Sequence, residues 1–206
     1  MIFRGTDTVA VLMEWILARL VLHPQVQQKV HEEIDTVVGR SRLLTEYDLT
    51  EMVYLTAVIK EVLRLHPPGP LLSWARLSVS DTLVDGYHIP KGTTAMVNMW
   101  AIMRDPHVWV RPLEFNPERF FNNCNNMDIS IWGSDLRIAP FGSGRRTCPG
   151  QNLAMTTVTY WVASLLQKFQ FGRWGESSID LSEMLRLSCE MANPLMVRIH
   201  SRKVCS

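Results

Sequence analysis

The sequence contains no long run of one charge. Its 206 residues include 21 Lys plus Arg and 20 Asp plus Glu, a formal net charge of +1 at pH 7 with neutral histidines. Proteins that bind nucleic acid normally present a basic patch or stripe to the phosphate backbone. The balance and scatter of charge therefore argue against this class, and we expect no nucleic acid among the partners.

Cysteine is also scarce, and the cysteines are not paired. The four are far apart in the chain, at Cys124, Cys148, Cys189 and Cys205. Disulfide frameworks and zinc fingers use close, repeated cysteine spacings, and zinc hydrolases use a His-Glu-x-x-His motif that is missing here. The pattern fits a reducing compartment better than a disulfide framework, and it suggests no zinc site.

An uninterrupted apolar run is missing as well. Residues 1–22 are largely apolar, but Arg4, Asp7, Glu14 and Arg19 lie among them. Each charged side chain costs about 2.5–3.5 kcal/mol near the centre of a bilayer. No small-residue cleavage site follows, so a signal peptide is not expected either. We interpret the segment as a buried helix, and a sequence that begins within such a helix is expected of a fragment of a longer protein.

The most informative stretch is 139–150, which surrounds Cys148. Pro149 follows the cysteine directly, and a helix-length apolar run continues to Phe169. This arrangement predicts Pro149 as the first helical residue and Cys148 as the N-cap. The amide groups and dipole of a helix N-terminus favour a thiolate, and the cationic Arg146 acts in the same direction.

Three glycines lie around this cysteine. Gly142, Gly144 and Gly150 are predicted to adopt positive φ angles and to let a flat ligand approach the backbone closely. Phe141 would cover the ligand or the sulfur with an apolar ring. The simpler interpretation is a glycine-rich turn that holds an ordinary buried cysteine.

The remaining pattern predicts a mainly α fold with small β-sheets, of the α+β class. A second helix should begin at Pro24 and end at Gly39, and a third should run over 51–65 until the proline-rich break at 66–70. Short strands are predicted at 71–78, 82–84, 87–89, 93–98 and 195–199, with a hairpin turn at Asp85-Gly86. Residues 99–134 should be irregular, with an exposed loop tip at 122–126.

The order Phe141-x-x-Gly144-x-Arg146-x-Cys148-x-Gly150 resembles the haem-binding signature of the cytochrome P450 family. In a sequence of average composition, these five residues match by chance at about one starting position in 10⁷. The resemblance implies haem b (heme b, iron-protoporphyrin IX) as cofactor and the Cys148 thiolate as the metal ligand. It also implies that Phe141, Gly144 and Gly150 contact the haem.

The same resemblance assigns two arginines to the haem propionates. Arg146 would bind one from the cysteine loop, and Arg76, after the proline-rich break, would bind the other. Arginine suits this role because its planar guanidinium can pair with a carboxylate through two hydrogen bonds.

A structural motif of the family is also present. Glu61 and Arg64 lie one helical turn apart ahead of the proline-rich break, where they can pair, and Arg119 in Pro117-Glu-Arg-Phe resembles the arginine that joins such a pair. The pair Glu183 and Arg186 has the same spacing but lacks this context. The alternative is that these residues form two surface ion pairs.

On the distal side, Gly5-Thr-Asp7-Thr8 resembles the motif in which an acid and an alcohol face bound oxygen. The resemblance makes Asp7 and Thr8 the catalytic residues that deliver protons, although by themselves they could be a polar stretch of helix. Arg4 lies one turn before Thr8, and we hypothesise that it pairs with an acidic substrate such as a fatty acid, or with a carboxylate of a segment outside this chain. Alternatively, its side chain extends to a polar edge.

The segments 3–8, 67–76 and 141–150 together resemble the plant organ-growth-regulating branch of the family. The resemblance implies that residues 1–206 are the C-terminal portion of a single cytochrome P450 domain, without its N-terminal half and membrane anchor. It further implies a haem-thiolate monooxygenase that inserts one oxygen atom of O2 into a small lipophilic substrate. An NADPH-dependent flavoprotein reductase would supply electrons, at the cytosolic face of the endoplasmic reticulum membrane.

Two alternatives remain open at this point. A haem-thiolate isomerase or dehydratase would keep the cofactor but need no reductase, and Asp7 and Thr8 argue against it. A truncated gene product without haem would have no activity.

Overall fold

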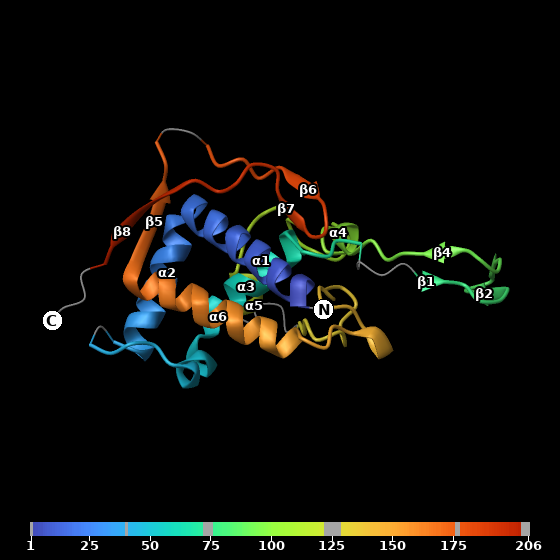
Figure 1. Cartoon of the computed structure of the whole chain (residues 1–206), viewed down its shortest axis with the longest axis horizontal. Coiled ribbons are helices and arrows are strands. Elements are labelled where there is room, and N and C mark those ends of the chain that lie inside the picture. Colours follow the sequence, from blue (N-terminus) through green and yellow to red (C-terminus); the bar gives the residue numbers. More distant parts are fainter. Residues whose placement is uncertain (1, 40, 72–75, 122–128, 176–177, 203–206) are drawn as a thin grey trace.

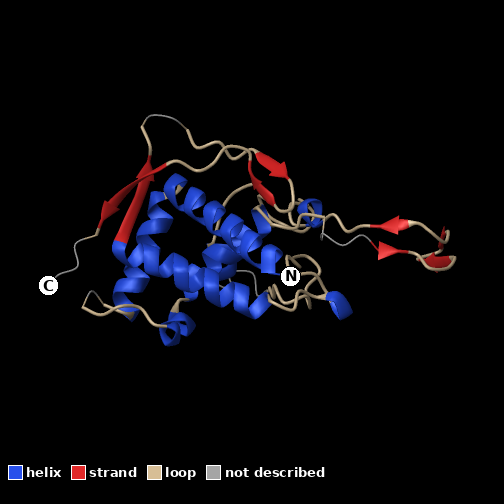
Figure 2. Cartoon of the chain, in the orientation of Figure 1, coloured by secondary structure: helices blue, strands red, loops and turns tan. Residues whose placement is uncertain are grey.

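The computed structural model describes residues 2–39, 41–71, 76–121, 129–175 and 178–202, with the side chains of residues 2–4 left out. Within these residues a body of helices carries four two-stranded sheets at its margins (Figure 2). The prediction of a mainly helical fold with small sheets is confirmed. The predicted loop tip at 122–126 lies outside the described residues, as do Cys124 and Cys205.

The first two helices meet at a proline. Helix α1 spans Ile2–Leu22 and α2 spans Pro24–Val37, with His23 between them and Pro24 at the first helical position. Proline tolerates this position because its missing N–H would have no partner there. Gly39 ends α2 with a φ of 75°, as predicted. No single helix in the described ranges is long and apolar enough to cross a membrane; α1 and α2 reach that length only together, and they are bent by 109°.

Helix α3, Val53–Leu65, begins two residues later than predicted because residues Glu46–Glu51 form a separate 3-10 helix, η1. A side chain from α2 accepts hydrogen bonds from the first backbone amides of α3. The Glu33 carboxylate accepts from Tyr54 N at 2.5 Å and from Leu55 N at 2.9 Å. Negative charge at a helix N-terminus is favourable, so this contact fixes α3 against α2.

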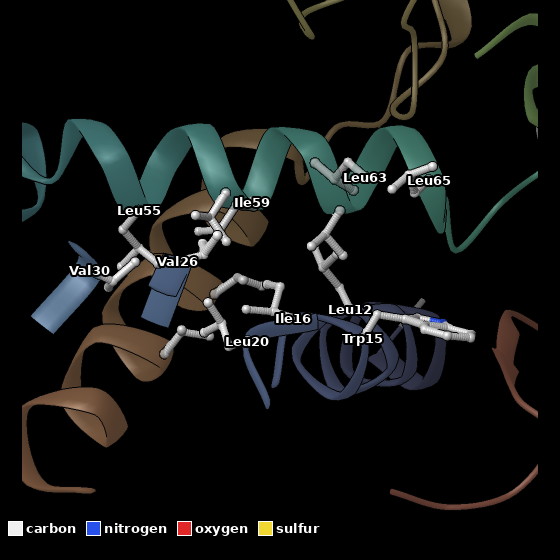
Figure 3. Close-up of a cluster of buried hydrophobic side chains, with 14 of the residues drawn as sticks. Leu12, Trp15, Ile16, Leu20, Val26, Val30, Leu55, Ile59, Leu63 and Leu65 are labelled. Carbon is white, nitrogen blue, oxygen red and sulfur yellow. The ribbon is translucent and has the colours of Figure 1, made fainter. Parts of the chain in front are cut away.

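The hydrophobic core lies between α1, α2, α3 and α6, which spans Gln151–Lys168. Figure 3 shows how side chains of α1 and α3 face one another and interlock. The residues labelled there come from α1 (Leu12, Trp15, Ile16, Leu20), α2 (Val26, Val30) and α3 (Leu55, Ile59, Leu63, Leu65), all buried. The apolar residues of each helix recur at helical spacing, which places them together on its buried face.

Four short strands form an arm that extends away from the helical body (Figure 1). Strand β1 (Arg76–Leu77) pairs with β4 (Thr94–Ala95), and β2 (Thr82–Val84) pairs with β3 (Tyr87–Ile89), all antiparallel. The hairpin turn is confirmed, since Asp85 and Gly86 both have positive φ. The strand predicted at 71–78 is shorter, although 72–75 lie outside the described residues.

The C-terminal part contains two further sheets. Strand β5 (Phe169–Arg173) pairs with β8 (Val197–Ser201), and β6 (Glu183–Leu185) pairs with β7 (Cys189–Met191). Only the terminal strand was predicted, and it begins two residues later than expected. The sequence did not predict β5 because that strand follows α6 without a turn signal. Between the arm and α6, the predicted irregular region contains two short helices, α4 (Met99–Ile102) and α5 (Glu118–Phe121).

Candidate haem-thiolate site

The cysteine loop closes on itself through its backbone. Gly142 N donates to Ala139 O at 2.9 Å, and Cys148 N donates to Phe141 O at 2.9 Å. A single 3-10 turn, η2 (Gly144–Arg146), connects the two ends of the loop. These bonds hold Cys148 half-buried beside Phe141, with its thiol free of any disulfide.

The predicted start of α6 is wrong by two residues. The helix begins at Gln151 with Gly150 as its N-cap, and the first helical hydrogen bond runs from Ala154 N to Gly150 O. Cys148 is therefore not the N-cap and Pro149 is not the first helical residue. The physical reason is that the amide of Cys148 is already bonded within the loop, which keeps this residue in the turn.

The glycine prediction holds for two of three positions. Gly142 and Gly144 have φ angles of 77° and 71°, as expected. Gly150 has a φ of −95°, so the prediction of a positive φ is wrong there; Gly150 serves as the helix N-cap instead. A Cβ built on any of the three would meet no atom within 4 Å. The backbone at these positions therefore borders open space.

An aromatic contact links the cysteine loop to the segment that precedes it. The ring of Trp132 stacks on Phe141, with centroids 6.0 Å apart and planes 11° from parallel. Nearby, a Cβ on Gly133 would lie 2.7 Å from Gly142 O, and Ser143 Oγ donates to Gly133 O at 2.6 Å. This support was not predicted, because nothing in the local sequence marks Trp132 as a neighbour of Phe141.

Three arginines line an open pocket of about 480 Å³: Arg76, Arg145 and Arg146. Within the described ranges none of them has a carboxylate partner. The structure thus brings the two predicted propionate ligands together and adds Arg145, whose only sequence signal is its position beside Arg146. A pocket of unpaired guanidinium groups suits a ligand with carboxylates.

Asp7 lies on α1, half-buried like its neighbour Thr8. Its carboxylate Oδ2 accepts a hydrogen bond of 2.5 Å from Ser188 Oγ, in the turn between β6 and β7. This contact ties the start of α1 to that turn. The side chain of Arg4 lies outside the described residues.

The motif that supports the site is confirmed. Arg64 donates from Nε and Nη2 to both carboxylate oxygens of Glu61 at 2.8 Å, and both side chains are 0% exposed. Arg119 Nε adds a bond of 3.0 Å to Glu61 Oε1. The third guanidinium nitrogen of Arg64 donates to the carbonyls of Met103 and Pro112 at 2.7 and 2.8 Å.

This geometry rules out the alternative of two surface ion pairs. Because every group in the buried cluster has a partner, the charges fix the irregular segment against α3. Glu183 and Arg186, which share the spacing, do not pair; Arg186 pairs with Glu190 instead.

A second buried polar cluster was not predicted. The ring of His66 stacks on Trp15 with centroids 3.9 Å apart. Its Nδ1 lies 2.7 Å from Glu183 Oε1, and its Nε2 lies 2.7 Å from Arg19 Nη2. Arg19 can only donate, so His66 Nε2 accepts and the ring is neutral with its proton on Nδ1. Burial lowers the pKa of His66 to about 4, and it also lowers the pKa of Arg19 to about 10.

We expect acid to destabilise the fold through His66. Its folded-state pKa of about 4 lies below the ordinary histidine pKa of 6.5, so the unfolded chain binds a proton more readily. The contribution of neutral His66 to the free energy of unfolding is therefore fully present above the pKa of the unfolded chain. It declines as pH falls towards 4, by about 3 kcal/mol for a shift of this size. Urea unfolding between pH 7 and pH 4 should show a shallower decline in His66→Gln than in the unchanged chain.

A second buried histidine limits the size of this effect. Burial also lowers the pKa of His31 to about 4, so part of the decline should remain in His66→Gln. Equal slopes in His66→Gln and the unchanged chain would contradict the assignment.

A helical body that supports a half-buried cysteine in a glycine-rich loop, with a fully buried Glu-x-x-Arg pair behind it, is the architecture that the signature predicted. The chain belongs to the cytochrome P450 family, whose family model matches residues 1–190. It is 64% identical over 207 residues to cytochrome P450 78A9 of Arabidopsis thaliana and 64% identical over 203 residues to cytochrome P450 78A3 of Glycine max. Each alignment covers 98% of this chain, in agreement with the predicted plant branch.

Solved structures support the same family assignment. A zebra fish cytochrome P450 with abiraterone is similar to this chain at a TM-score of 0.83 and 34% identity, over 95% of this chain and 44% of that one. A zebra fish structure with progesterone gives a TM-score of 0.82. The chain spans 38% of the length of the Arabidopsis relative.

Proposed function

We propose that this chain binds haem b with the Cys148 thiolate as the iron ligand. The observation that supports this most is the combination of open space over Gly142, Gly144 and Gly150 with three arginines around one pocket that have no carboxylate partner among the described residues. These features fit a flat cofactor with two carboxylates. In this arrangement Arg76, Arg145 and Arg146 bind the propionates, and Phe141 packs against the haem beside the sulfur.

The proposed reaction is monooxygenation, with residues 1–206 as the C-terminal portion of a single catalytic domain. One oxygen atom of O2 enters a C–H bond of the substrate and the other leaves as water, which consumes two electrons and two protons. A haem with a thiolate ligand supplies the redox chemistry that cleaves O2. The residues of this chain have three tasks: Cys148 binds the iron, the arginines orient the cofactor, and Asp7 and Thr8 deliver the protons.

The electron donor in this proposal is an NADPH-dependent flavoprotein reductase, and the site of action is the cytosolic face of the endoplasmic reticulum membrane. The support is the similarity to plant members of the family over nearly the whole chain. We propose no nucleic acid as a partner, because the net charge is only +1 and basic residues are scattered.

The proposed substrate is a small lipophilic molecule, with a fatty acid as the leading candidate. The motivation is the spacing of Arg4 and Thr8, which lie one turn apart on α1, because a buried guanidinium on that helix face would need an anionic partner. A carboxylate held by two hydrogen bonds would meet this need.

The function is tested in a full-length chimera, in which residues 1–206 replace the matching segment of cytochrome P450 78A9. With reductase, NADPH and a fatty acid, we expect a thiolate-type shift of the Soret band in the reduced carbon monoxide complex and one atom of labelled O2 in the product. Rearrangement of a hydroperoxide without reductase would instead identify an isomerase or dehydratase. Failure to bind haem would refute both.

The same assay tests the substrate class. The Arg4→Gln chimera should lose turnover of the acid but keep turnover of its methyl ester, because only the acid carries the charge that Arg4 recognises. Equal losses for acid and ester would show that Arg4 does not read the substrate's charge.

A further inference from the structure

Ser188 contacts the proposed proton donor, although 181 positions separate it from Asp7 in the chain. It is 2% exposed and lies in the turn between β6 and β7. Its hydroxyl donates to Asp7 Oδ2 at 2.5 Å, a short O–H···O hydrogen bond. We propose that Ser188 is a positioning residue: it holds one oxygen of Asp7 in place and leaves the other available for proton transfer. This inference rests on the proposed function.

The turn that presents the hydroxyl is fixed independently of Asp7. Arg186 N donates to Ser188 O at 3.0 Å, and Cys189 N donates to Pro68 O at 2.9 Å. The indole of Trp15 donates to Cys189 O at 3.0 Å, which ties the same turn to α1. Ser188 is therefore held on both sides by backbone contacts, and loss of its hydroxyl should not release the turn.

The far end of β6 is anchored as well. Glu183 accepts from His66 Nδ1 at 2.7 Å and from Trp100 Nε1 at 2.7 Å. With both ends of the hairpin attached to the helical body, the position of the hydroxyl is set by the fold. A side chain held in this way can orient a carboxylate without reorganising during the reaction, which is the condition for efficient proton transfer.

The proposal predicts a specific chemical fault when the hydroxyl is lost. Monooxygenation consumes two electrons and two protons for each O2 and forms water and product. If Asp7 delivers its proton too slowly, the same two electrons and two protons leave as hydrogen peroxide and the substrate is unchanged. The diagnostic quantity is therefore the product formed for each NADPH consumed.

The test compares three variants of the full-length chimera: Ser188→Ala, Ser188→Thr and Ser182→Ala. Ser182 is a matched control, because its hydroxyl donates to Asp180 at 2.6 Å in an exposed turn ahead of β6. We expect Ser188→Ala to reduce product per NADPH by about tenfold, the order expected for one hydrogen bond to a charged group, with a matching rise in peroxide. Ser188→Thr, which keeps the hydroxyl, and Ser182→Ala should stay near the unchanged chimera.

A second measurement does not depend on turnover. Hydrogen exchange in the carbon monoxide complex should become faster at the amides of residues 8–12 in Ser188→Ala, because the tether at the start of α1 is lost. Ser188→Thr and Ser182→Ala should show no such change. If exchange is unchanged in Ser188→Ala, the tether itself is refuted.

The two measurements also separate this inference from the proposed function. A chimera without reductase-dependent oxygenation refutes the function, and exchange still decides whether Ser188 holds Asp7. An active chimera in which Ser188→Ala exchanges faster but keeps its product yield refutes the positioning role. Failure of Ser188→Thr to restore the yield, with the Soret shift intact, refutes it too.

Discussion

Replacement of Cys148 by serine in the full-length chimera is expected to abolish the thiolate-type Soret shift and all monooxygenase activity. A neutral hydroxyl cannot donate charge to iron as a thiolate does. The loop should survive the change, because its closure depends on the backbone bond from Cys148 N to Phe141 O at 2.9 Å and not on the sulfur. Reduced carbon monoxide difference spectra measure the outcome directly.

The other cysteines provide the controls. Cys189 is buried in β7, and burial raises the pKa of its thiol to about 11, so it stays protonated and is a poor metal ligand. We expect Cys189→Ser, Cys124→Ser and Cys205→Ser to keep the thiolate-type spectrum. A thiolate-type spectrum in Cys148→Ser would refute the assignment of the iron ligand.

Truncation of Glu61 to alanine should be the most destabilising single change outside the cysteine loop. It leaves the buried guanidinium of Arg64 without its charge partner and also removes the acceptor of Arg119. Removing one partner of a buried ion pair costs about 3–5 kcal/mol, a large part of the 5–15 kcal/mol that stabilises a typical domain. Urea unfolding of the chimera should show this loss, together with poor retention of haem.

An exposed pair with the same spacing provides the matched control. Arg111 and Glu114 are three residues apart, with side chains 69% and 46% exposed and a distance of 3.0 Å between Nη1 and Oε2. Water screens such a pair, so Glu114→Ala should cost about 1 kcal/mol or less. Comparable losses in Glu61→Ala and Glu114→Ala would mean that the buried cluster does not stabilise the fold as its geometry indicates.

The features that could be predicted from the sequence are those defined by nearby residues. Glu61 and Arg64 are three positions apart on a helix, so a helical pattern alone places them together. The hairpin turn at Asp85-Gly86 follows from two residues that accept positive φ. The signature around Cys148 is equally local, and all three predictions were confirmed by the geometry or by the family match.

Errors arose where one local element depended on another. Gly150 was expected at positive φ, but it caps α6 because the amide of Cys148 is bonded to Phe141 instead of starting the helix. Strand β5 was missed because it follows α6 without a turn signal and its partner, β8, comes only after a long connection. The pattern of residues within one segment carries no information about hydrogen bonds to a distant segment.

The sequence by itself determined the family and the Glu61–Arg64 pair, and it predicted the iron ligand that we propose, because each depends on spacing within a few residues. Only the tertiary structure decided which groups lie around them. His66 meets Glu183 across 117 positions, and Asp7 meets Ser188 across 181. Such contacts form only when α1, the end of α3 and the β6–β7 hairpin pack together. Packing of distant segments brings polar groups out of water, and each buried group then requires a partner that local sequence does not specify.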